Sequence, residues 1–148
     1  MLGDWAARIS ALAAIFGLLL LISLFLPWAQ IVCELEPCEY PTGWQVLSVL
    51  DVPIAILAVV AAGLGLMVML SRVPLAALAL ALAGVVAIVL VWLAPVVEDD
   101  AARPVDFGGS YFLGMLGAFG VIVAGLAVFF IVRESRDDQE GEEADEKS

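Results

Sequence analysis

Two cysteines carry the most distinctive chemistry in this sequence. Cys33 and Cys38 are separated by four residues in the polar stretch 26–51, LPWAQIVCELEPCEYPTGWQVLSVLD. On an extracytoplasmic loop such a pair oxidises, which predicts a disulfide that closes the tip of a short hairpin, with residues 30–32 as one arm. The alternative is a redox-active pair, but the acidic neighbours disfavour the reactive thiolate.

Other side chains that support catalysis are scarce. The 148 residues contain no histidine, which removes the usual proton shuttle, the commonest metal ligand and every nucleophile pair that depends on imidazole. The acidic cluster 98–100 is expected to be a solvated loop, because it lacks the ligand spacing of a calcium loop. Binding of a hard cation by the outer acids stays open. We therefore expect a protein that is not an enzyme and that has no cofactor and no metal site.

The composition indicates a membrane as the natural solvent. Hydrophobic residues make up 64% of the chain and charged residues only 16%, which is too apolar for an ordinary soluble domain. The formal net charge of −11 leaves no basic face for phosphates, so we do not expect nucleic acid as a partner.

Four apolar runs, each long enough to cross a bilayer, organise the chain. They cover residues 9–26, 52–70, 75–94 and 111–132. Only residues 71–73 separate the second run from the third, so these two must form an antiparallel hairpin. The predicted fold class is an all-α membrane protein, an antiparallel bundle of four transmembrane helices in residues 1–132. Outer loops at 27–51 and 95–110 are expected to form a short extracytoplasmic hairpin cap.

The tail and the arginines predict the orientation. Residues 133–148 are charged, small and polar, a composition typical of a disordered acidic tail. If all four runs cross the membrane, one side carries Arg8, Arg72, Arg133 and Arg136, and the other side carries Arg103. By the positive-inside rule we expect a multi-pass protein of the cell membrane with both termini in the cytoplasm.

The outer stretch 26–51 also holds candidate recognition residues. Trp28 follows the first run, where tryptophans anchor helices at the interface, and Trp44 lies in a capping-box pattern, TGWQ. Asp51 opens the second run and is suited to cap it. We expect Trp28, Trp44 and Asp51 to be outer-loop interaction residues. Whether 43–50 forms a separate interfacial helix or one bent helix with the second crossing is left open.

Small residues recur at helical spacing inside the runs. Such stripes let helix backbones approach closely where lipid supplies no hydrophobic drive. They serve either the internal packing of one bundle or, on the glycine-rich fourth run, the docking of a partner or a second copy. The candidate packing residues are Ala79, Ala83, Ala87, Gly114, Gly117, Ala118, Gly120 and Ala124.

The motifs at 26–28 (LPW), 43–44 (GW) and 50–51 (LD) resemble those of a type of small bacterial four-transmembrane-helix membrane protein of unknown function. The chain is more loosely similar to the claudin-like tetraspan plan, which has both termini inside and a tryptophan and a cysteine pair in the first outer loop. That similarity implies only the topology, because the order here is Trp28, Cys33, Cys38, Trp44.

These observations together favour a non-enzymatic integral membrane protein. We expect an accessory, scaffold or structural subunit that associates with another membrane protein, or with itself, through the small-residue faces and the disulfide-clamped loop. One alternative is a small oligomeric channel or transporter subunit whose acidic loops concentrate cations. A membrane thiol oxidoreductase is the third hypothesis, although such enzymes use a closer cysteine pair together with a second pair.

Overall fold

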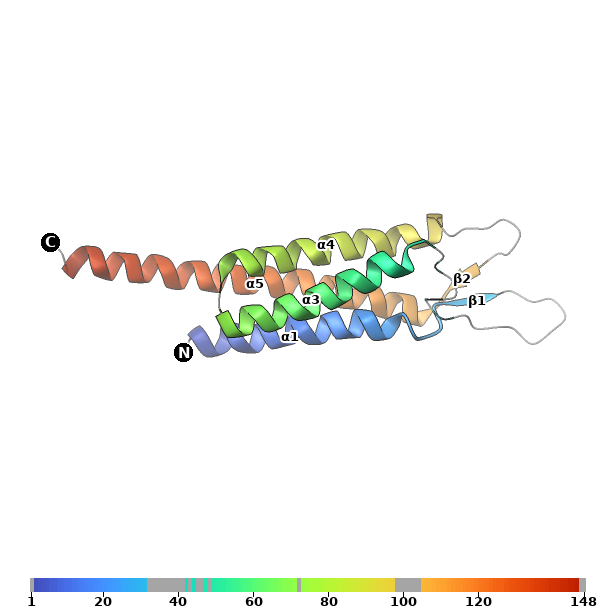
Figure 1. Ribbon diagram of the computed structural model, residues 1–148, viewed down its shortest axis with the longest axis horizontal. Coiled ribbons are helices and arrows are strands. Elements are labelled where there is room, and N and C mark those ends of the chain that lie inside the picture. The colour runs from blue at the N-terminus through green and yellow to red at the C-terminus, as the bar shows by residue number, and fades with distance from the viewer. Residues whose placement is uncertain are drawn as a thin grey trace.

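The computed structural model describes residues 2–31, 42, 44, 47, 49–71, 73–97 and 105–146. Its main elements are four long helices, which Figure 1 shows lying alongside one another. They are α1 (Leu2–Ser23), α3 (Asp51–Ser71), α4 (Pro74–Val97) and α5 (Gly109–Glu146). The predicted all-α four-helix bundle is confirmed.

The helices begin where the sequence supplies suitable first residues. The Asp51 carboxylate accepts a hydrogen bond from the Val52 backbone N–H at 2.7 Å, and Pro74 stands at the first position of α4, where a missing N–H costs nothing. Helix α1 begins before Ile9 and ends at Ser23 rather than at Leu26. The first crossing therefore lies earlier in the chain than the apolar run alone predicted.

The four helices form an antiparallel ring. Helix α1 packs against α3 and α5, and α4 packs against the same two helices. Each neighbour in this ring runs in the opposite direction, so both chain termini lie at one end of the bundle and the outer loops at the other (Figure 1).

Apolar side chains face both into and out of the bundle. The interior holds fully buried residues such as Leu20, Ile54 and Leu80. Large apolar side chains also cover the outside of every helix, for example Leu70 at 80% exposure. Exposure of such a surface to water would be unfavourable, whereas its contact with lipid is not. All four helices are long and apolar enough to span a membrane, as expected for a multi-pass membrane protein.

The C-terminal segment differs from the sequence prediction. Residues 133–148 were expected to be a disordered tail, but α5 continues without a break to Glu146 and extends alone beyond the other helices (Figure 1). The physical reason is that the transmembrane part of α5 already provides the helix nucleus. Adding Arg, Glu and Gln residues to an existing helix costs little, because their helix propensities are high.

A short two-stranded sheet joins the two outer loops. Strand β1 (Ala29–Ile31) pairs antiparallel with β2 (Val105–Phe107), and Gln30 lies opposite Asp106. The sequence predicted that residues 30–32 would pair within their own loop as a hairpin. The described pairing of Gln30 and Ile31 is instead with the second outer loop. An isolated bridge between Pro27 and Thr42 is the described contact within the first loop.

Candidate functional site: the outer end of the bundle

Trp28 is the central side chain at the outer end of the bundle. It follows the last turn of α1 and is fully buried. Its indole N–H donates a hydrogen bond of 2.5 Å to the Ser23 carbonyl, and its ring meets the Tyr111 ring edge-on with centroids 5.7 Å apart. Trp28 therefore lies inside this end of the bundle, and its role as an outer-loop interaction residue stays a prediction.

The burial of Trp28 depends on a glycine of the opposing helix. A Cβ added at Gly114 of α5 would lie 3.1 Å from the edge of the Trp28 ring and 3.0 Å from the Ser23 hydroxyl. Because glycine has no side chain, the indole fits between α1 and α5 and satisfies its N–H there. The outer end of the bundle is thereby closed by an aromatic group.

Trp28 also ties the bundle to the small sheet. Its backbone carbonyl accepts a hydrogen bond of 2.7 Å from the Gly108 N–H, directly before α5 begins. The ladder between β1 and β2 continues from this bond. The two outer loops therefore emerge from the bundle as one connected cap, to which α1 and α5 are both anchored.

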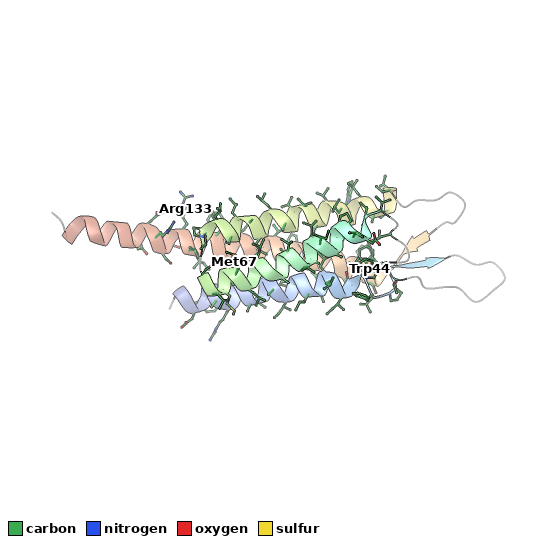
Figure 2. All side chains as sticks on the ribbon, in the orientation of Figure 1. Trp44, Met67 and Arg133 are labelled. Atoms are coloured by element: carbon green, nitrogen blue, oxygen red, sulfur yellow. The ribbon has the colours of Figure 1, made fainter. Side chains whose placement is uncertain are left out.

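Trp44 lies beside this closure, at the loop end of the bundle (Figure 2). Its backbone N–H donates to the Leu24 carbonyl at 3.2 Å, and its ring lies 5.8 Å from the Phe25 ring. The side chain is half-buried against the same hydrophobic cluster that contains Trp28 and Leu47. Its indole N–H is enclosed, and no acceptor for it lies in the part of the chain that the structure describes.

Asp51 lies at the start of α3, on the same side of the bundle. Its carboxylate binds the Val52 backbone N–H, as noted above, so the side chain caps its own helix. Segment 43–50 is described only at Trp44, Leu47, Val49 and Leu50. Because α3 begins at Asp51, one bent helix that runs through 43–50 into the second crossing is not formed.

The predicted disulfide falls outside the part of the chain that the structure describes. Cys33 and Cys38, and the acidic cluster 98–100, all lie beyond the described residues. Their pairing and any cation binding stay predictions.

The small residues of the fourth run face the inside of the bundle. A Cβ at Gly117 would lie 3.0 Å from the Leu20 backbone nitrogen, and one at Gly120 would collide with the Phe16 ring. Ala118 and Ala124 are buried. In α4, Ala83 and Ala87 are buried, whereas Ala79 is half-buried.

Several packing residues were not identified from the sequence. Close approach of α1 to α3 depends on Gly17, whose Cβ would lie 2.8 Å from the Ala62 nitrogen. Close approach of α4 to α5 depends on Gly84 and Gly125, each with a comparable contact of 2.8 Å. Ser23, whose carbonyl accepts the Trp28 indole N–H, was not singled out from the sequence either. A small residue in a run of larger apolar residues is the sequence signal for such a contact. The sequence does not show which helix the small residue faces.

The chemistry of this site is that of a packed closure. Within the described ranges, no group of three or more His, Cys, Asp or Glu residues is positioned to hold a metal ion. The buried polar side chains there, Ser10 and Ser23, each donate to a carbonyl of their own helix at 2.7 Å. The comparisons agree in giving no relative: no protein-family model, no curated protein and no solved structure matches this chain.

Proposed function

We propose that the chain is a non-enzymatic accessory or scaffold subunit, which uses its outer cap to associate with another membrane protein. The observation that carries this proposal is the joining of both outer loops on a closed bundle. The sheet β1–β2 and the bond from Gly108 to Trp28 make the two loops one unit. The paired residues 29–31 and 105–107 need little further ordering when a partner binds, which lowers the cost in conformational entropy.

The small-residue faces contribute less to this proposal than the sequence suggested. Residues 16–28 of the same chain already pack against Gly114, Gly117 and Gly120. A partner helix would have to displace α1 to reach them. We therefore assign partner association to the cap and the internal packing of the bundle to the glycines.

A channel through a single copy is disfavoured by the bundle interior. The described buried polar side chains, Ser10 and Ser23, are both satisfied by their own helix, and their neighbours in the core are apolar. An ion crossing such an interior would lose its hydration without replacement. An oligomeric channel would have to place its path between copies.

The proposed location is the cell membrane with both termini in the cytoplasm and the cap outside. The support is the arginine distribution together with the position of both termini at one end of the bundle (Figure 1). Similarity to the claudin-like plan adds only this topology. The proposed disulfide between Cys33 and Cys38 would form on the oxidising side.

Site-specific photo-crosslinking in intact cells tests the cap as the association surface. A photoreactive amino acid replaces Val49, which is 64% exposed beside the cap, and in a matched variant it replaces Leu82, which is 59% exposed on the outside of α4. We expect a discrete adduct with one membrane protein at position 49 and none at position 82. That partner should also become less abundant when this chain is deleted.

Two results would contradict the proposal. Equal adducts at both positions would indicate nonspecific contact in the bilayer. Purification of the chain alone from its native membranes, with no adduct at position 49, would remove the accessory role.

A further inference from the structure

The indole N–H of Trp44 is the unexplained polar group at the outer end of the bundle. Its nitrogen is buried and has no hydrogen-bond partner among the described residues. An enclosed donor without an acceptor destabilises the fold, so native proteins rarely retain one without a use for it. Trp28, in the hydrophobic cluster on which Trp44 packs, provides the contrast, because its indole N–H donates to the Ser23 carbonyl.

The surroundings of Trp44 indicate what kind of acceptor is accessible. Phe25 is 61% exposed and its ring lies 5.8 Å from the Trp44 ring. Leu26 and Val49 are also exposed. Ile22, whose carbonyl accepts a hydrogen bond from the Phe25 N–H, is exposed as well.

The position of Trp44 along the bundle axis indicates which hydrogen-bond acceptor lies near it. Its backbone is bonded to Leu24, one residue after α1 ends. The membrane-spanning helices begin and end at this level, where the hydrocarbon core meets the glycerol region of a bilayer. Indole side chains are favoured there because their N–H can bond to the interface while the ring stays in apolar contact.

We propose that Trp44 binds an outer-leaflet glycerolipid, with its indole N–H donating to an ester carbonyl oxygen of that lipid. The acyl chain lies along Ile22 and Phe25. In the described conformation the nitrogen is shielded, so the lipid oxygen reaches it when the Trp44 ring turns outward past the exposed Phe25 ring. Among the described residues, one backbone hydrogen bond and packing on the core hold Trp44 in place, and the proposed rotation exchanges part of this packing for contact with lipid. The proposal does not depend on the accessory role.

Lipids with and without ester groups provide a direct test on the unmodified chain. The protein, labelled with ¹⁵N-tryptophan, is placed in nanodiscs of ester-linked phosphatidylglycerol or of its ether-linked counterpart, which retains the phosphate but has no carbonyl. The indole resonances are assigned with single Trp→Phe variants. We expect the Trp44 N–H proton to resonate further downfield in the ester lipid, and the Trp28 N–H to be unchanged because its acceptor is Ser23.

Substitution gives a second measurement. Trp44→Phe retains an aromatic ring and removes the donor, so it should lower Tm in the ester lipid by on the order of 4 °C more than in the ether lipid. Trp28→Phe, the control, should lower Tm equally in both lipids, since it loses a bond within the protein.

An identical Trp44 resonance in the two lipids overturns the proposal, because a phosphate oxygen or a trapped water would then be the acceptor. An equal effect of Trp44→Phe in both lipids overturns it as well. The resonance experiment remains decisive if the variant fails to fold.

Discussion

At the scale of single residues, the glycines show how closely the helices approach. Gly65 of α3 faces α1, and a Cβ there would lie 2.8 Å from the Ala14 backbone nitrogen. Gly63, on the same helix, has no atom within 4 Å of the corresponding position. The two residues have the same chemistry and nearly the same depth in the membrane, but only Gly65 is required by a neighbouring backbone.

This pair predicts opposite effects of one substitution. Gly65→Ala should destabilise the bundle by about 1–3 kcal/mol, because a backbone atom of α1 cannot move without separating the helices. Gly63→Ala should be neutral or stabilise by up to about 1 kcal/mol, because alanine is the better helix former. Unfolding of both variants in the same detergent micelles measures the difference. A loss of stability at Gly63 equal to that at Gly65 would mean that the packing of α1 on α3 is not as described.

Residue roles at the outer end were predictable in part. The types were recognised: Trp28, Trp44 and Asp51 do gather around the ends of α1 and α3. The sequence did not reveal that Trp28 is buried, because its burial depends on Gly114, which is distant in sequence. A tryptophan after an apolar run has the same local pattern whether it faces lipid or a gap on an opposing helix.

At the scale of elements, α5 is the helix that departs most from expectation. Its apolar part was readable from length and hydropathy alone. Its polar end was not, because composition reports whether a segment can bury a core and not whether a preceding helix nucleates it. The sheet was missed for a related reason: strands of three residues, far apart in the chain, carry no periodicity to detect.

Helix nucleation by the membrane-spanning part gives a prediction for the tail. A peptide of residues 133–148 alone should be largely unfolded in water, since its helical part, 133–146, is close to the length of about 12–15 residues at which even good isolated helices are marginal. In the full chain, Glu134→Pro should remove helical structure after that position, while the stability of the bundle changes by less than about 0.5 kcal/mol. Amide hydrogen exchange of residues 135–146 reports the first effect and thermal unfolding the second. Strong helicity in the isolated peptide would contradict this account.

At the scale of the whole molecule, the antiparallel ring follows from few constraints. The chain crosses the membrane four times, its helices are too apolar to leave the membrane, and the connection at 71–73 is tight. An up-and-down bundle is the simplest arrangement that meets these constraints. The architecture was therefore predictable, whereas the inward direction of the glycines required the structure.

The orientation of this molecule in the membrane is testable with reporter fusions. Green fluorescent protein after Ser148 should fluoresce, because the C-terminus is proposed to be cytoplasmic. Alkaline phosphatase should be active when fused after Asp100 and inactive when fused after Ser71, which serves as the matched control on the cytoplasmic side. The reverse pattern of phosphatase activity would place the termini outside.

Helix α5 has a mechanical consequence for the molecule. It is a single helix of 38 residues, about 57 Å long at 1.5 Å per residue, and strand β2 ends just before it begins. One stiff rod thus runs from the end of the bundle that carries the sheet to beyond the opposite end. A force or torque applied to the C-terminal segment is transmitted along this rod to the contact between Gly108 and Trp28, without passing through a hinge in the membrane.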